Sequence, residues 1–529
     1  MKSGCIKYED IQFLPKLIND YLFAKHKLDS FYNQEPNLKG FQNAINSRNF
    51  SQQKREILVD VLSVKYDGIR NSEKQKNHIE LLKNNNTFTV TTGHQLCLFT
   101  GPLYFIYKIL SVVKLAEQLK AEFPNKDFVP IYWMASEDHD FDEINHFFLH
   151  NQRFDCSTNS FGAVGDITPE FEGMLDSFEQ ELGKGKLGKE LFDLFKNAYT
   201  NSTLSQGTFS LVHELLGDYG IVILNPDNKK LKVVFQPYVE QELQKQVGYN
   251  FVNNTSARLD DQGYKTQVNP RDINLFYLMP QLGNRVRIEK TKPGFKLADN
   301  SREFTENEIL EDLKKYPERY SPNVILRPIY QEVVLPNLSY TGGAGELSYW
   351  FQLKDMFTDF EVTFPILMLR NSAIIFSKNN KKRLNKLGLN YSDLFLEISK
   401  LEKLLLKKHG TNQIDLNEGK DSLKSLFIKI KELAVTVNPS LAITSDATTT
   451  KALKLISKLE KKLERHETVN LQTVLDQLYL VLEEVFPNGS FQERRTNFSE
   501  YYLEDGKEFF KQAYDKFEPL EFEISILNR

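Results

Sequence analysis

Residues 87–135 read TFTVTTGHQLCLFTGPLYFIYKILSVVKLAEQLKAEFPNKDFVPIYWMA and decide the fold. The β-branched run Thr87–Thr92 is typical of a strand, and the apolar run Phe128–Ala135 is typical of a buried one. Between them a periodic segment begins at Pro102, which suits the first turn of a helix because its missing N–H needs no partner there. A strand–helix–strand unit closes as a right-handed parallel crossover. The stretch therefore predicts the opening of a doubly wound parallel α/β sheet.

The same pattern returns later in the chain. An apolar run at 220–225 precedes a helical segment at 229–246, and a strand pattern at 333–340 leads to a glycine-rich turn. A helix at 347–357 and a strand at 364–370 follow. We interpret the first eighty residues as a helical cover and the more polar intervening stretches as insertions. The predicted core domain spans residues 1–383, with insertions near 147–205 and 248–322.

Apolar residues recur at spacings of three and four along residues 384–470, which predicts an α-helical coiled-coil arm. Breaks at Gly410 and Pro439 allow its helices to fold back on one another. Two interpretations stay open: a hairpin that packs only within its own chain, or an arm that joins two copies into a homodimer. Residues 471–529 are expected to return to the core. The predicted seam positions are Leu394, Ile398, Leu401, Leu405, Leu423, Leu426, Ile430, Leu433 and Val437, followed by Leu471, Val474, Leu478, Val481 and Val485.

The composition excludes several classes of protein. The 529 residues are 40% hydrophobic and carry a formal net charge of −4, so the chain lacks the basic surface that general nucleic-acid binding requires. No stretch approaches the roughly 20 apolar residues of a membrane span, and the first ten residues lack the apolar core of a secretory signal. Three widely spaced cysteines argue against a disulfide framework. A cytoplasmic globular protein, with neither nucleic acid nor membrane as a partner, is expected.

The densest polar cluster is residues 136–146, SEDHDFDEINH, directly after the strand that ends at Ala135. It holds five acids, two histidines and an asparagine. In open α/β sheets ligands bind at the carboxyl ends of strands, so this cluster is the predicted reaction centre. The candidate catalytic residues are Glu137, Asp138, His139 and His146.

Two chemistries remain open for this cluster. If the segment were helical, His139, Glu143 and His146 would share one face and could reach a single metal ion. In an irregular loop, a carboxylate could act as general base on an amine nucleophile, with a histidine shuttling the proton. Some of the acids, Asp142 among them, are expected to be exposed or ion-paired.

Two further loops follow predicted strands. Thr92–Gln95 leads toward the helix start at Gly101-Pro102, where backbone N–H groups could bind a phosphate or carboxylate. The segment Tyr340–Trp350 has three glycines in four residues and could lie against a nucleotide or sugar. Neither loop carries the dinucleotide fingerprint or the Walker spacing. The candidate nucleotide- or anion-binding residues are Gly93, His94, Gln95, Thr100, Gly101, Gly342, Gly343 and Gly345.

Together the segments 92–104 and 133–146 resemble the BshC family of cysteine ligases of bacillithiol biosynthesis. The glycine-rich segment 340–350, the strand at 367–372 and Gln492-Glu493-Arg494 resemble the same family, so the resemblance extends over almost the whole chain in order. Many members of that family carry Gln where this chain has His94.

The resemblance implies a Rossmann-like core with insertions, a late coiled-coil domain, and an enzyme that forms a carbon–nitrogen amide bond between L-cysteine and the amine of glucosaminyl-malate. Amide formation from a free carboxylate is unfavourable in water, so the carboxylate of cysteine must be activated. Activation by ATP or another nucleotide with Mg stays a hypothesis, and no resident metal is firmly implied. A guanidinium can hold a carboxylate through two parallel hydrogen bonds, as at Arg327, Arg370 or the pair Arg285 and Arg287. The candidate substrate-binding residues are Asn145, Arg327, Arg370, Asn371, Glu346 and Tyr340.

Two alternatives come from other classes: a metal-dependent hydrolase that uses His139, Glu143 and His146, and a non-enzymatic coiled-coil scaffold. The ligase hypothesis predicts that polar residues from three loops line one cleft at the carboxyl ends of the central strands. In it Asp138 or His139 deprotonates the amine, Arg327 or Arg370 holds a malate carboxylate, and the loop 93–102 receives the activating anion. The residues expected to line the cleft are His94, Asp138, His139, Asn145 and Glu346.

Overall fold

Five parallel strands form the central sheet in the order β13-β12-β2-β3-β6. The computed structural model describes residues 4–24, 26–159, 162–279, 284–410 and 416–529. In order of appearance along the chain, the strand order is 3-2-1-4-5, which is the Rossmann arrangement. The predicted doubly wound, Rossmann-like sheet is therefore confirmed. Its strands are β2 (Thr87–His94), β3 (Asp127–Met134), β6 (Val222–Leu224), β12 (Asn337–Gly342) and β13 (Ile366–Leu369).

The sheet reverses its strand order between β2 and β12, because the chain goes from β2 to β3 on one side and reaches β12 on the other. Both strands are buried almost throughout, so their threonines need internal partners. Thr89 and Thr91 donate hydrogen bonds to Oδ1 of Asn337 at 3.1 and 2.8 Å. Polar side chains therefore fix the pairing at the switch point of the sheet.

Helices pack on the sheet where the sequence predicts them, and one further helix occupies part of a predicted strand. Helix α5 (Tyr104–Glu122) packs on β2 and β3, and α10 (Lys229–Lys245) packs on α13 (Arg327–Val334). The strand predicted at 333–340 is wrong in its first part, since Val333 and Val334 end helix α13 and β12 starts only after Pro336. A short apolar run that is buried on all sides does not distinguish a helix from a strand. The helix predicted at 347–357 is divided into two helices, α14 (Ala344–Phe351) and α15 (Lys354–Asp359).

The N-terminal residues form the expected helical cover, and α2 and α4 contact strands of the central sheet. The first inserted region carries a two-stranded sheet followed by helices, and the second carries a helix and a five-stranded antiparallel sheet of order β10-β9-β8-β7-β11. The elements concerned are α1 (Lys16–Phe23), α2 (Leu38–Ser47), α3 (Gln52–Tyr66), α4 (Glu73–Leu81), α6 (Phe141–Ile144), β4 (His146–Leu149), β5 (Gln152–Asp155), α7 (Met174–Leu182), α8 (Lys186–Tyr199), α9 (Leu204–Leu216), α11 (Val247–Asp261), β7 (Leu275–Leu278), β8 (Arg285–Lys290), β9 (Gly294–Leu297), β10 (Glu303–Thr305), α12 (Glu306–Lys315) and β11 (Tyr320–Pro322).

The chain divides into two units, of which the larger comprises residues 1–9, 13–374 and 490–527. In that unit β1 (Cys5–Lys7) pairs antiparallel with β15 (Glu523–Asn528), so the C-terminal strand joins a small sheet that is separate from the central one. The second unit comprises residues 10–12, 375–489 and 528–529. Its start differs from the expected boundary at 383 because α16 (Lys378–Leu387) packs against α20 (Gln472–Val485).

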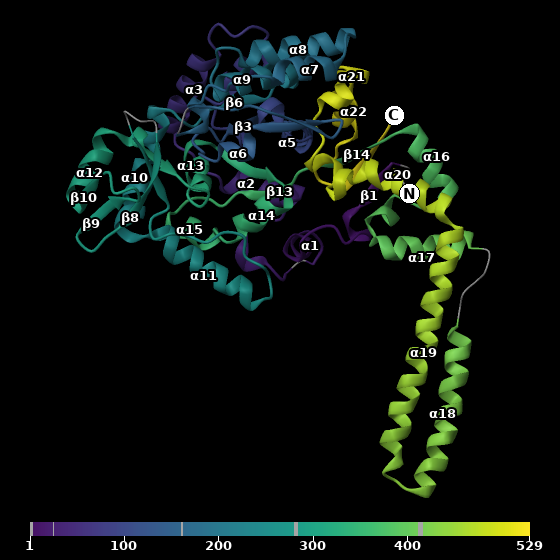
Figure 1. Cartoon of the computed structure of the whole chain (residues 1–529). Coiled ribbons are helices and arrows are strands. Elements are labelled where there is room, and N and C mark those ends of the chain that lie inside the picture. The colour runs from purple at the N-terminus through teal and green to yellow at the C-terminus, as the bar shows by residue number, and fades with distance from the viewer. Residues whose placement is uncertain (1–3, 25, 160–161, 280–283, 411–415) are drawn as a thin grey trace. The chain divides into compact units, whose positions relative to one another are not determined.

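The coiled coil of the second unit is a hairpin of α18 (Asn417–Val437) and α19 (Leu441–Asn470), which lie side by side (Figure 1). Helix α17 (Ile398–His409) ends before Gly410, and α18 ends before Pro439, as expected. Within the hairpin, however, Leu426, Leu433 and Val437 are 53%, 69% and 76% exposed. These three positions of the predicted seam therefore do not face α19. None of the helices in the described part of the chain combines the length and apolar character needed to cross a membrane.

Candidate active site

The carboxyl ends of β2, β3 and β12 enclose a cavity of about 230 Å³. We call it the switch-point cavity, because it lies where the strand order reverses, the place where open α/β sheets bind ligands. Three polar segments that follow separate strands meet there. The lining residues are Gly93, His94, Gln95, Tyr104, Trp133, Ala135, Asp138, Val324, Arg327, Pro328, Gln331, Tyr340, Glu346, Tyr349 and Trp350.

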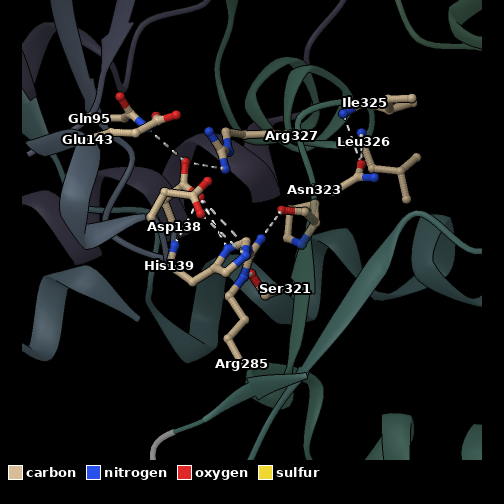
Figure 2. A network of polar contacts seen from close by, with 12 residues as sticks. Gln95, Asp138, His139, Glu143, Arg285, Ser321, Asn323, Ile325, Leu326 and Arg327 are labelled. Carbon is tan, nitrogen blue, oxygen red and sulfur yellow. Dashed lines mark hydrogen bonds and ion pairs between the residues drawn. The ribbon is translucent and has the colours of Figure 1, made fainter. Parts of the chain in front are cut away.

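Asp138 lies at the centre of a polar network beside this cavity (Figure 2). Its Oδ2 lies 3.5 Å from Nη2 of Arg327 and 3.5 Å from Nε2 of Gln95. Its Oδ1 accepts the backbone N–H of His139 at 3.0 Å and lies 3.8 Å from Nη1 of Arg285. One carboxylate is thus held by three side chains from distant parts of the chain and by one backbone N–H.

This environment fixes the charge of Asp138. Burial alone raises its pKa, but hydrogen bonding by His139 and the charges of Arg327 and Arg285 outweigh burial and hold the pKa well below the usual value for an aspartate. The carboxylate therefore stays ionised at physiological pH. An acid with so low a pKa is a poor proton acceptor but a suitable partner for a substrate ammonium group.

Arg285 brings a fixed cation to the site from β8 of the inserted sheet (Figure 2). Its guanidinium lies 3.8 Å from the ring centre of Phe276, and its Nε donates to Ser321 Oγ at 3.1 Å. Burial and the charge of Arg327 lower the pKa of Arg285 to about 10, so it remains charged near neutral pH. Nη1 of Arg285 lies 2.9 Å from Nδ1 of His139. Because a guanidinium only donates, Nδ1 of His139 is the acceptor in this contact.

An ion pair between a buried lysine and a partly exposed glutamate connects the two helices that start at the switch point. Lys108 of α5 donates to a carboxylate oxygen of Glu346 on α14, and to the carbonyl oxygen of Gly93 at 2.9 Å. Glu346 also accepts the backbone N–H of Gly343 at 3.1 Å through its other oxygen. A β-carbon on Gly342 would lie 2.8 Å from that oxygen, so a side chain at this position would displace the Glu346 carboxylate. The Glu346 carboxylate thus occupies the N-terminus of α14.

His94 ends β2 as a neutral group. Burial and the charge of Lys108 hold its pKa well below 6.5, although a hydrogen bond to the backbone of Gln95 raises it. Nδ1 lies 3.0 Å from the carbonyl oxygen of Gln95, which can only accept, so Nδ1 carries the proton and Nε2 does not. The ring packs against Tyr104 at 5.2 Å and Phe105 at 5.0 Å between ring centres.

The loop between β2 and α5 is preformed in a strained conformation. Phe99 and Thr100 have φ values of 48° and 67°, which residues other than glycine rarely adopt. Gly101 has φ 61°, and a β-carbon there would lie 2.7 Å from Cβ of Cys97. Nδ2 of Asn497 donates to the carbonyl oxygens of Phe99 and Gly101 at 2.8 and 2.6 Å. The C-terminal segment therefore holds the loop in place.

Several predicted site residues lie outside the switch-point cavity. Glu137 is buried in an ion pair with Lys232. Arg370 is buried, donates to Glu493 Oε1 at 2.5 Å and to the Asn371 carbonyl oxygen at 3.1 Å, and is not in the cavity wall. Among the residues expected in one cleft, His94, Asp138 and Glu346 line the cavity, whereas His139 and Asn145 do not. Thr100, Gly101, Gly342, Gly343, Gly345, His146 and Asn371 are also absent from its wall.

The conditional metal geometry is wrong. Helix α6 is a single turn, Phe141–Ile144, so His139 lies before it and His146 begins strand β4. Within the described ranges, the only group of three potential ligands with atoms within 4.8 Å of one another is Asp138, His139 and Asp140. The structure does not bring His139, Glu143 and His146 together. A hydrolase built on those three ligands is therefore not supported.

Comparisons with known proteins assign the family. The model of the N-terminal Rossmann-like domain of bacillithiol biosynthesis BshC matches residues 1–371, and that of the BshC C-terminal coiled-coil domain matches residues 373–529. The chain belongs to the BshC family. A Flavobacterium johnsoniae protein named "Putative cysteine ligase BshC" is 40% identical, with 100% of both chains covered. The proteins of that name from Flavobacterium psychrophilum and Christiangramia forsetii are 41% and 39% identical, over 100% of this chain and 99% of theirs.

Two buried lysines of this BshC-family chain escaped the sequence analysis, although each is ion-paired next to a strand end. Lys108 interrupts the apolar run Phe105–Val113, and a charge inside such a run is a signal of a buried partner. Lys232 donates to Glu137 and to the carbonyl oxygen of Tyr320 at 2.9 Å. Both lysines hold acids that the sequence identified.

Proposed function

We propose that this BshC-family protein is a cysteine ligase that joins L-cysteine to the amine of glucosaminyl-malate through an amide bond. The observation that carries the proposal is the network of Asp138, Arg327 and Gln95 at the switch-point cavity. A permanent carboxylate and a guanidinium side by side suit a substrate that has both an amine and carboxylates. The relatives named as cysteine ligases support the same reaction class.

In this proposal Asp138 orients the substrate amine and His139 removes its proton. An amine attacks only when unprotonated, so a proton acceptor within reach raises the reactive fraction. The low pKa of Asp138 suits it to holding the ammonium form. Proton uptake on Nδ1 of His139 displaces Arg285, whose Nη1 is already within 3.8 Å of Asp138. Arg327, whose side chain is 23% exposed, orients a malate carboxylate.

Amide formation from a free carboxylate requires activation, and a nucleoside triphosphate with Mg is the proposed source. The glycine-rich turn at 342–345 fits a nucleotide phosphate poorly. Glu346 already accepts the Gly343 N–H there, and its negative charge repels a phosphate. The loop before α5 is the other candidate binding site for the phosphates of the activating nucleotide.

Mass spectrometry tests the reaction directly. The purified full-length protein is incubated with cysteine, glucosaminyl-malate and ATP, and the products are compared with incubations that lack one component. A new thiol of the mass of the condensed product, together with AMP or ADP, is expected. Absence of that product under all conditions, with folded protein, contradicts the proposal.

A further inference from the structure

A second cavity of about 300 Å³ lies on the other side of the loop that precedes α5. We call it the arginine cavity. Its wall shares Gln95 and Tyr104 with the switch-point cavity, so these two side chains separate the two spaces. Its volume is at the lower end of the range for small-molecule sites. The lining residues are Gln95, Cys97, Pro102, Tyr104, Glu143, His146, Phe147, Phe148, Ser490, Arg494 and Arg495.

The wall carries two guanidinium groups without carboxylate partners in the described ranges. Arg494 is exposed and lies 5.7 Å from the ring centre of Phe13, while Arg495 lies 3.9 Å from that of Phe148. Nε of Arg495 donates to the amide oxygen of Asn151 at 3.4 Å. Neither arginine forms an ion pair with any carboxylate that the structure describes. Aromatic faces and a neutral amide orient these charges without neutralising them.

The acid in this wall is hydrogen-bonded to a neutral side chain of the same wall. Oε2 of Glu143 accepts a hydrogen bond from Nε2 of Gln95 at 3.1 Å (Figure 2). Burial and the charge of Arg153 lower the pKa of His146, so this ring is neutral at physiological pH. The two arginines therefore outnumber the single carboxylate, and the wall has a net positive charge.

The segment that carries the arginines is held rigidly against the rest of the site. The backbone of Thr496 pairs with Phe148 of β4, and its carbonyl oxygen accepts the N–H of Leu103 at 2.9 Å. Asn497 holds the strained loop before α5, as described above. Pro102 and Tyr104, at the start of the 19-residue helix α5, line the same cavity. The positive end of the helix dipole thus adds to the field of the two arginines.

We propose that the arginine cavity binds a doubly charged oxyanion of the substrates, held between Arg494 and Arg495. This inference rests on the proposed function, which supplies two anions of that kind: the dicarboxylate of the malate group and the phosphates of an activating nucleotide. Both match the bidentate geometry of a guanidinium. Because Gln95 contacts Asp138 on one side and Glu143 on the other, an anion here lies one side chain away from the acceptor site.

Titration calorimetry of the full-length protein tests the subsite with two probes, L-malate and inorganic phosphate. The double variant Arg494→Gln/Arg495→Gln should weaken binding of the anion by at least tenfold. Arg70→Gln is the control, because Arg70 is exposed and lines neither cavity. Thermal unfolding verifies that the double variant is folded, as expected for two side chains that are exposed or half-buried.

The two probes identify the source of the anion. Malate binding that depends on the arginines, with a KM for glucosaminyl-malate raised at least tenfold and kcat within threefold, assigns the cavity to the dicarboxylate. Phosphate binding with the same dependence, and a raised KM for ATP, assigns it to the nucleotide. Equal binding of both probes by the wild type and the folded double variant, or binding of neither probe to the wild type, overturns the inference. If the wild type binds a probe through the arginines but forms no cysteine adduct, the proposed function fails and the subsite stands.

Discussion

Lys108 and Glu346 form an ion pair although 238 positions separate them in the sequence. The lysine side chain is 2% exposed and therefore cannot leave the carboxylate for water. The pair connects α5, which follows β2, with α14, which follows β12, across the switch point. Glu346 in turn lines the cavity, so the lysine acts as a positioning residue.

Replacing this lysine tests that role. Lys108→Met should lower the free energy of unfolding by about 2 kcal/mol, because the Glu346 carboxylate, which is 32% exposed, loses a charge-assisted hydrogen bond. It should also lower kcat/KM at least tenfold, and Lys108→Met/Glu346→Gln should recover much of the stability. Urea unfolding of the single and double variants measures the coupling. Lys120→Met, which removes an exposed lysine of the same helix, is the control. Equal destabilisation in the single and double variants would contradict the role.

The roles proposed for Asp138 and His139 predict a large loss of turnover when either side chain is replaced. Asp138→Asn should lower kcat/KM at least a hundredfold at every pH with the shape of the profile unchanged, because the low pKa of Asp138 keeps it ionised throughout the accessible range. His139→Ala should also lower kcat/KM at least a hundredfold, because the substrate amine then loses its proton acceptor. Measuring kcat/KM of both variants from pH 5.5 to 9 checks the two losses and the unchanged shape for Asp138→Asn. Near-normal turnover in both variants would show that the cluster is structural.

The parts of the site that the sequence predicts are those that depend on residues close together along the chain. Strands β2 and β3 and the cluster after Ala135 were predictable because periodicity and turn chemistry are local. The sequence also indicated Asp138 and Glu346 through their places after strands. It could not show that Arg370 is committed to Glu493, 123 positions away, or that Arg285 reaches His139 from an inserted sheet. Such pairings are set by tertiary packing.

The buried pair of Arg370 and Glu493 predicts a stability effect where the sequence suggested a substrate clamp. Both side chains are at most 8% exposed, and Ser372 donates to the second carboxylate oxygen. Arg370→Ala should therefore lower the free energy of unfolding by about 3–5 kcal/mol, since it leaves a buried charge unpaired. Denaturant unfolding measures it. A folded variant of unchanged stability, with a raised KM for glucosaminyl-malate, would instead support the original prediction that Arg370 binds a substrate carboxylate.

Glu332 predicts a pH dependence of stability. Burial raises its pKa to about 7, against the opposing charge of Arg48 and hydrogen bonds from Gln331 and Asn337. Because the folded pKa is above the unfolded one, the contribution is fully present below about pH 4.5 and is lost as pH rises through 7. The change is at most about 3 kcal/mol. Glu332→Gln should therefore gain stability relative to the wild type between pH 5 and pH 8, measured by urea unfolding. Glu122→Gln, on an exposed residue, should show no such change.

The exposed stripe on α18 predicts a homodimer through the hairpin. Leu426, Leu433 and Val437 are more than half exposed, and on α19 Ile443 is 79% exposed. Apolar side chains at this spacing form a seam that a second copy can bury. Leu433→Glu/Val437→Glu should convert a dimer to a monomer in light scattering with helicity unchanged in circular dichroism. Lys424→Glu, on an exposed lysine of the same helix, controls for the added charge. A dimer that persists after deletion of residues 417–470 would show that copies associate elsewhere, and a monomeric wild type would show that the stripe has another role.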